Sequence, residues 1–134
     1  MNFFPLFFTA LPIALAVDLV WIGLVANKFY SSQLGDLFSP TVQWVPAVIF
    51  YVIFIAAVTF FVIQPAVQAN SWVQALLWGA FFGLAAYATY DLTNLAVIRD
   101  WPLFMSIVDI AWGTFFTAGI STATYFIATT FFTR

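Results

Sequence analysis

The sequence predicts an all-α integral membrane protein, an up-down-up-down four-helix bundle formed by one transmembrane domain, residues 1–134. Two observations support this fold class. Hydrophobic residues make up 65% of the 134 residues and charged residues only 6%, too few to cover the surface of a water-soluble domain. Four long apolar segments are joined by short polar connections, so consecutive helices must run antiparallel.

The first apolar segment runs from about residue 3 to 26. It lacks a cationic n-region and a cleavage site, so we interpret it as a retained helix and not as a signal peptide. Residues 27–43 form the longest polar stretch, in which apolar residues at helical spacing predict a short interfacial helix over 29–38. The second span covers about residues 45–63 and is expected to end at Gln64-Pro65.

The third span covers about residues 72–98, and the fourth covers about 103–131. Gly79 and Gly83 lie four residues apart on the third span, which favours close approach of a neighbouring helix. Small residues also repeat every four positions on the fourth span, at Gly113, Thr117 and Ser121. Four antiparallel spans place both termini at one end of the bundle, the first side, and the loops near residues 27–43 and 99–102 at the second side.

Several classes of function are excluded by residues that the chain lacks. Without cysteine there can be no disulfide, thiolate catalysis or iron–sulfur ligation. Without histidine the commonest general base and the usual haem and zinc ligand are missing, so we predict no cofactor. The three basic residues form no patch for nucleic acid. No serine or threonine is evidently paired with a carboxylate, so the sequence leans against an enzyme.

The acidic residues carry the main functional signal. All five are aspartates, and Asp18, Asp91 and Asp109 lie inside apolar segments. A carboxylate at mid-bilayer costs roughly 2.5–3.5 kcal/mol on insertion scales, so it normally faces protein or water and marks a functional site. We therefore expect these three side chains to turn inward.

Helix geometry predicts that the three aspartates lie at one depth. With a rise of about 1.5 Å per residue, Asp18 lies roughly 20 Å from the first side, and Asp91 and Asp109 lie within roughly 10 Å of the second side. These positions coincide in a hydrocarbon core of about 30 Å. Neighbouring polar and aromatic residues complete the predicted ligand- or cation-binding set: Asp18, Asp91, Asp109, Asn94, Tyr51, Tyr87, Tyr90, Trp21 and Trp112.

Two of these residues are tryptophans that follow an aspartate by three positions. The pairs are Asp18 with Trp21 and Asp109 with Trp112, and each pair shares one helix face. An indole N–H in such a position can donate to a carboxylate. Tyr87 also shares a face with Asp91, although packing or an interfacial position is the more common role for Tyr87 and Tyr90 in a chain this rich in aromatic residues.

The aspartates have two interpretations. In the structural one, each is a protonated, hydrogen-bonded clamp between helices. In the functional one, three close carboxylates cannot all ionise in a low-dielectric site, which favours proton exchange or cation binding. A metal bound by Asp18, Asp91 and Asp109 would be a hard one, Na⁺, Ca²⁺, Mg²⁺ or Mn²⁺.

Three functions remain open. The first is transport or permeation of a small solute or cation, coupled to protons or to a cation and aided by homo-oligomerisation, because four helices make a narrow bundle. The second is a non-catalytic accessory or lipid-binding subunit of a larger membrane complex. A membrane enzyme acting on lipid comes third. In each case the lipid bilayer is the one partner that composition predicts.

Seven strings of the sequence resemble those of a known family. The longest span residues 18–23, 86–95 and 108–113, and the most specific are Tyr-Asp-Leu-Thr-Asn and Asp-Ile-Ala-Trp-Gly. The shorter matching strings are Phe29-Tyr30, Leu34-Gly35, Phe50-Tyr51 and Trp101-Pro102. The chain is similar over nearly its whole length to a family of small bacterial four-span predicted membrane proteins of unknown function. The resemblance implies a multi-pass protein of the bacterial inner (cytoplasmic) membrane, and it assigns no activity and no catalytic residue.

Overall fold

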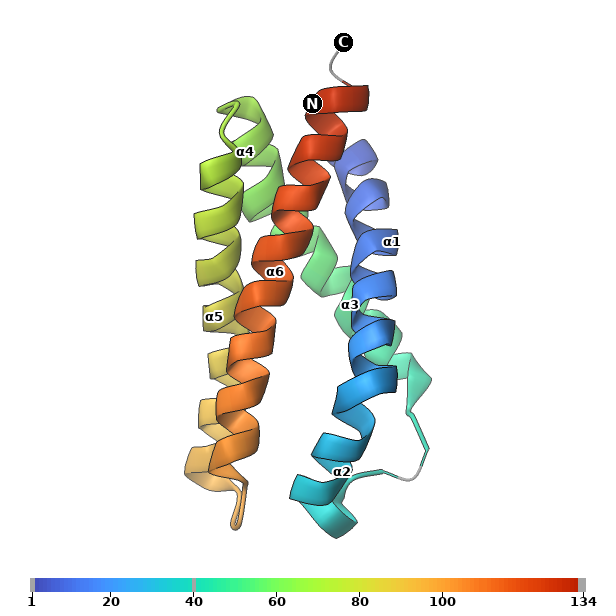
Figure 1. Cartoon of the computed structure of the whole chain (residues 1–134), viewed down its shortest axis with the longest axis vertical. Coiled ribbons are helices and arrows are strands. Elements are labelled where there is room, and N and C mark those ends of the chain that lie inside the picture. The colour runs from blue at the N-terminus through green and yellow to red at the C-terminus, as the bar shows by residue number, and fades with distance from the viewer. Residues whose placement is uncertain (1, 40, 133–134) are drawn as a thin grey trace.

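The computed structural model describes residues 2–39 and 41–132, which form four antiparallel helical rods (Figure 1). The segments are α1 (Phe3–Trp21), the π-helical η1 (Ile22–Ala26), α2 (Asn27–Leu34), the 3-10 turn η2 (Gly35–Leu37), α3 (Trp44–Val58), the π-helical η3 (Thr59–Ile63), α4 (Gln64–Gln68), α5 (Trp72–Val97) and α6 (Leu103–Phe131). The first rod joins α1 to α2, the second joins α3 to α4, and α5 and α6 are the third and fourth.

Each rod is long and apolar enough to cross a membrane. The four candidate spans contain 35, 25, 26 and 29 residues. At about 1.5 Å per residue even the shortest exceeds a hydrocarbon core of about 30 Å. The predicted all-α bundle of four membrane helices is thus confirmed, and its outer surface contacts the lipid bilayer.

Two helix ends differ from the expectation. The second rod does not end at Ile63 but continues through Pro65 to Gln68. Proline removes one hydrogen bond from the continuous rod, which a membrane helix tolerates because local π-helical geometry, here η3 just before Pro65, helps to satisfy the freed carbonyl. The first rod likewise continues past Ala26, so the expected interfacial helix is an extension of the first span. Its α-helical part ends at Leu34, because Gly35 has a left-handed φ of 58°, and the 3-10 turn η2 completes the 35-residue span at Leu37.

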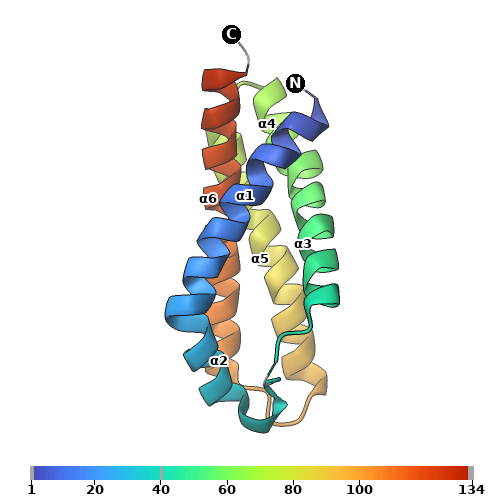
Figure 2. The same ribbon diagram turned by 90° about the vertical axis from the view of Figure 1, so that its right-hand side faces the viewer.

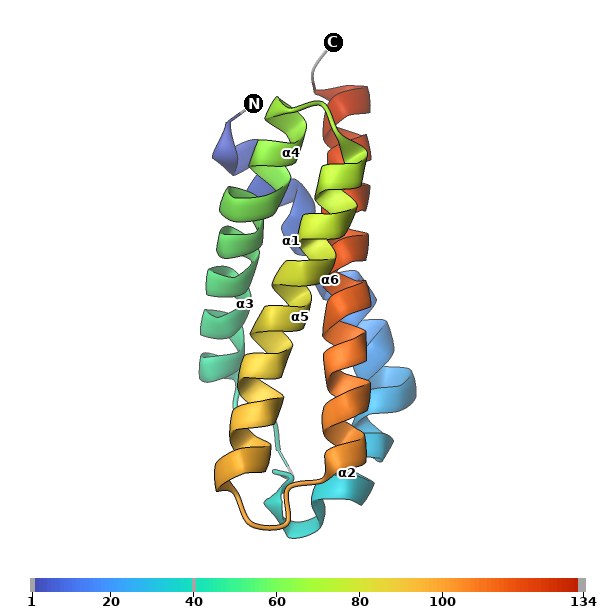
Figure 3. The same ribbon diagram turned by 90° about the vertical axis from the view of Figure 1, so that its left-hand side faces the viewer.

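The closest helix contact joins α5 to α6, which lie side by side along their lengths (Figure 3). A Cβ added at Gly83 would lie 2.2 Å from the carbonyl oxygen of Gly113, and one added at Gly79 would lie 2.9 Å from the Ser121 hydroxyl. The glycines therefore let the two backbones touch, as the four-residue spacing predicts.

An apolar core fills the half of the bundle towards the first side. The first rod supplies Leu6 and Ala10, the second supplies Ile55 and Val58, and α6 supplies Ile120. All five are at most 1% exposed. In this half α1 crosses and contacts α6 (Figure 2).

The second rod separates from the third towards the second side. Figure 1 shows α3 running away from α5 below α4. From Trp44 to Phe50 every side chain of α3 except Ala47 is exposed. The bundle is consequently closed at the first side and open between α3 and α5 near the second.

Candidate acidic site in the second-side half

Asp109 on α6 is the central member of an acidic cluster. Its carboxylate lies within electrostatic range of Asp18 on α1 and of Asp91 on α5. Three helices thus bring their aspartates to one layer of the bundle. No lysine or arginine interacts with them in the part of the chain that the structure describes.

The three carboxylates differ in burial and in partners. Asp91 is completely buried, and neither of its oxygens accepts a hydrogen bond from the described residues. Asp18 is 9% exposed. Asp109 is partly buried and accepts a hydrogen bond of 2.6 Å from the Tyr30 hydroxyl of α2. The Asp91 carboxyl group interacts with that of Asp109, and a buried carboxyl pair without a basic partner among the described residues is costly to keep in the fold.

The tyrosines of α5 border the cluster. Tyr87 lies within electrostatic range of all three aspartates, and its ring fills the space over Gly113, where an added Cβ would lie 2.1 Å from Cγ of Tyr87. Tyr90 faces Asp91 and Asp109, interacts with the Asn94 side chain, and packs edge-on against the Trp101 ring at 5.9 Å.

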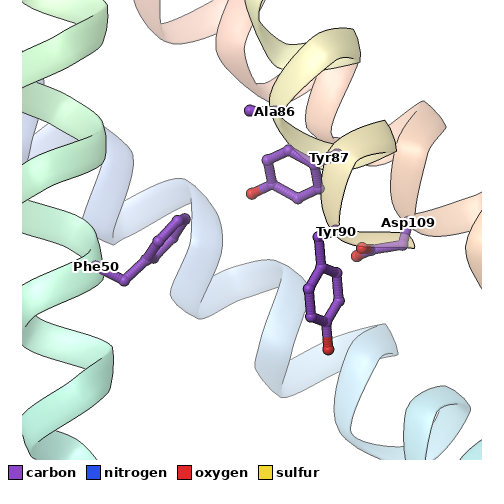
Figure 4. A pocket seen from close by; sticks show the side chains of 5 residues that line it. All are labelled: Phe50, Ala86, Tyr87, Tyr90 and Asp109. Atoms are coloured by element: carbon purple, nitrogen blue, oxygen red, sulfur yellow. The ribbon is translucent and has the colours of Figure 1, made fainter. Parts of the chain in front are cut away.

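A cavity of about 330 Å³ adjoins the cluster between α3, α5 and α6. Its lining residues are Phe50, Ala86, Tyr87, Tyr90 and Asp109 (Figure 4). In Figure 4 the Phe50 ring points from α3 towards the tyrosines of α5. A second cavity, of about 240 Å³, lies on the α2 side and shares Tyr90 and Asp109 with the first. Asp109 is therefore reachable from two directions.

The tryptophans bridge helices and do not serve their own aspartates. Trp21 and Trp112 stack face to face, with ring centroids 4.2 Å apart and planes 5° apart. The indole N–H of Trp112 approaches Asp18, and that of Trp21 approaches Tyr30, although neither reaches the geometry of a conventional hydrogen bond. An indole N–H does approach a carboxylate, but the pair that meets joins α1 to α6, because stacking turns each ring across the interface.

The family profile described as "Predicted membrane protein (DUF2177)" matches residues 3–126. The chain belongs to this family. No curated protein and no solved structure shows a significant match to the chain. Membership confirms the resemblance seen in the sequence motifs and establishes a predicted membrane protein, and the family description leaves the activity open.

Of the predicted site residues, Tyr51 lies apart from the acidic cluster. Tyr51 packs its ring against Phe50 at 5.6 Å, and no described interaction connects it to the aspartates. Successive side chains of a helix point about 100° apart. An error of one residue in predicting which face of α3 turns inward therefore places Tyr51 at the site where the structure has Phe50.

Tyr30 and Phe50 contact the site, although the sequence analysis included them only among the strings of the family resemblance and not among the candidate site residues. The Tyr30–Asp109 bond joins residues 79 positions apart, and nothing local signals it. The only local clue is that Tyr30 follows Asp18 on one continuous rod, which the polar stretch after Ala26 obscures.

The three aspartates lie too far apart in space to form a metal site together. Within residues 2–39 and 41–132, no three acidic, cysteine or histidine side chains converge closely enough to hold an ion. Asp109 instead interacts with Asp18 on one side and with Asp91 on the other, and aromatic rings lie beside these carboxylates. This arrangement suits protons and large, weakly hydrated cations better than a small hard metal ion, which needs several oxygens at once.

Proposed function

We propose that this protein transports a small solute or cation across the membrane, with Asp18, Asp91 and Asp109 exchanging protons or binding the cation. One observation carries the proposal: carboxylates from three helices converge at membrane depth without a basic partner among their described neighbours. Such groups are costly in a membrane and are normally retained for ion or proton pathways.

Access to the cluster from one side supports transport. The cavities that reach Asp109 lie in the second-side half, whereas tightly packed side chains such as Leu6 and Ile55 close the first-side half. A site near mid-membrane that opens to one side at a time is the arrangement that alternating access requires.

The carboxylates have complementary roles in this proposal. Asp109 faces the cavities and is the group that a substrate meets first. Asp91, buried behind it, exchanges a proton with Asp109 as charge enters or leaves. Three neighbouring carboxylates in a low-dielectric site cannot all be charged, so cation entry and proton release are naturally coupled.

The resemblance to small bacterial proteins supports a place in the bacterial cytoplasmic membrane, which we include in the proposal. We also treat the chain as one domain. A homo-oligomer would widen the pathway, because the two cavities that reach Asp109 are small.

Reconstituted protein tests the proposal. Liposomes loaded with a pH-sensitive dye receive inward gradients of Na⁺, K⁺ or tetramethylammonium in turn, and the internal pH is followed. We expect at least one gradient to drive proton movement about tenfold faster than in protein-free liposomes. Asp91→Asn should abolish this difference, because the amide cannot exchange a proton.

The matched control is Asp100→Asn, at an exposed aspartate in the α5–α6 loop with φ of 61°, a conformation that asparagine tolerates. Its flux should equal that of the unmodified protein. Flux indistinguishable from protein-free liposomes for every gradient, or undiminished flux in Asp91→Asn, would contradict transport through this cluster.

One observation favours a second candidate, a non-catalytic accessory or lipid-binding subunit. The exposed start of α3, from Trp44 to Phe50, has no cover from its own chain and is long enough to bind a helix of another protein. Purification in mild detergent would distinguish the two candidates. A stoichiometric partner together with absent flux favours the accessory role, and flux from the isolated protein favours transport.

A further inference from the structure

Two cavities meet at the Asp109 carboxylate. The larger, of about 330 Å³, lies between Phe50 on α3 and the Ala86–Tyr90 stretch of α5. The smaller, of about 240 Å³, lies under the α2 end and includes Tyr30. Both are lined by Tyr90 and Asp109, so the carboxylate and the tyrosine ring stand where the two spaces join.

The larger cavity opens laterally, towards the bilayer. Phe50 and Tyr90, on opposite sides of it, are 48% and 55% exposed, so its rim lies on the outer surface of the bundle. Phe50 follows the start of α3 at Trp44 by six residues, or about 9 Å along the helix, which lies within the hydrocarbon core. A molecule dissolved in the membrane can therefore reach Asp109 between α3 and α5.

The residues that line the larger cavity favour a ligand that has both a positive charge and an apolar body. Phe50, Tyr87 and Tyr90 supply aromatic faces, and Asp109 supplies the one charged group (Figure 4). Aromatic faces around a carboxylate recognise alkylammonium groups, which are attracted to the rings and shed water easily. A phosphate or carboxylate ligand would be repelled by the same wall.

Asp91 provides an independent indication of a cation. It is completely buried next to Asp109, and neither of its oxygens accepts a hydrogen bond from the described residues. The charged groups that face Asp109 are Asp18 from α1 and Asp91 from α5, both acidic. No basic side chain among the described residues therefore competes with a cationic ligand for Asp109.

We propose that the cavity between α3 and α5 binds an amphiphilic organic cation, a protonated or quaternary amine with an apolar body, which enters from the bilayer and places its nitrogen against Asp109. This proposal rests on the proposed transport function and names its substrate class. The polar cavity under α2 is the exit towards the second side.

Three ligands of the same shape and different charge test the proposal. Benzyltrimethylammonium is the cation, neopentylbenzene is its neutral isostere, and phenylmethanesulfonate is an anion of similar size. Binding to the full chain in lipid nanodiscs is measured by calorimetric titration. We expect saturable binding of the cation at least tenfold tighter than of either other ligand.

Asp109→Asn should weaken binding of the cation at least tenfold while leaving neopentylbenzene binding unchanged. Asparagine keeps an oxygen for the Tyr30 hydroxyl, so this variant retains the helix contact. Asp36→Asn, at an exposed loop aspartate, is the control and should bind as the unmodified protein does. Equal binding of the three ligands, or unchanged cation binding in Asp109→Asn, would overturn the proposal.

A second pair of variants tests sideways entry. Phe50→Trp narrows the cavity and should slow cation association at least threefold, whereas Phe61→Trp, on the same rod and 65% exposed, should leave it unchanged. Equal rates in both variants would refute the route between α3 and α5.

Binding and flux together separate the two proposals. Proton movement driven by Na⁺ or K⁺ without benzyltrimethylammonium binding would overturn this substrate class and leave transport standing. Charge-selective binding that depends on Asp109 without flux would support the site and contradict transport.

Discussion

Two levels of α5 meet their neighbours in opposite ways. Towards the first side, Gly79 and Gly83 touch the backbone of α6 so closely that no methyl group fits at Gly83. Towards the second side, Ala86 and Tyr90 border a cavity of about 330 Å³ opposite α3. The same helix is therefore a tight structural partner at one level and the wall of a cavity at the other.

The difference shows how a small membrane bundle separates stability from function. Inside lipid there is no hydrophobic gain in pressing helices together, so close packing of small residues has to hold the bundle. The α5–α6 contact and the core around Ile55 provide that packing. The second-side half can then remain open and hold buried carboxylates that weaken the fold.

The largest effect is expected where the backbones touch. Gly83→Ala places a methyl group 2.2 Å from the Gly113 carbonyl oxygen and should lower the free energy of unfolding by about 3 kcal/mol, since overpacked cores lose about 1–3 kcal/mol. The measurement is an SDS titration in mixed micelles. Gly119→Ala on α6, with no atom within 4 Å, is the control and should change stability by less than about 1 kcal/mol. Similar losses in both variants would mean that α5 and α6 do not touch at Gly83.

A smaller effect should separate the two halves of α3. Ile55→Ala removes a completely buried side chain and should cost about 2 kcal/mol, the low end for such changes, because lipid already offers apolar surroundings to the unfolded chain. Ile49→Ala, in the first half of α3 at a position 53% exposed, should cost less than about 0.5 kcal/mol in the same titration. If the two losses are equal, α3 packs along its whole length and the contrast fails.

At the acidic cluster the expected change has the opposite sign. Asp91→Asn replaces a buried carboxylate without a described hydrogen-bond donor by a neutral amide, so the free energy of unfolding should rise by about 1 kcal/mol. Asp100→Asn, in the exposed loop, should leave it unchanged. A loss of stability in Asp91→Asn would identify this residue as a structural clamp between helices.

The smallest effects concern two tyrosine hydroxyls. Tyr30→Phe removes the 2.6 Å bond to Asp109 and should cost about 0.6 kcal/mol, the average for hydrogen bonds between membrane helices. Tyr125→Phe removes a longer bond of 3.2 Å to Asn70, near the first side, and should cost less. Thermal melts in one detergent can rank the two variants. The reverse order would place the more important polar contact outside the acidic half.

The fold could be predicted further than the site. Span positions follow from apolar length, and the Gly79–Gly83 spacing predicts the close helix contact. The depth of Asp18, Asp91 and Asp109 follows from counting residues, because helical rise is fixed. The ends at Ala26 and Ile63 were misplaced, since polar residues and proline are tolerated within a long membrane rod.

Contacts between side chains of different helices could not be predicted by counting residues along each helix. Tyr30 reaches Asp109 over 79 positions, and Trp112 turns from its own aspartate to Asp18. Rotation of each helix about its axis fixes these pairings, and packing against the other helices sets that rotation. For the same reason Phe50, and not its neighbour Tyr51, lines the cavity.

The sequence by itself determined that this protein spans the membrane four times and carries three aspartates at one depth. Both properties depend on the length and composition of the apolar segments, because exposing polar groups to lipid is costly. Only the tertiary structure decided which side chains meet Asp109, where the helices part, and which half of the bundle stays open. Those features depend on helix rotation and crossing, which side-chain packing fixes and which have no signature in hydropathy.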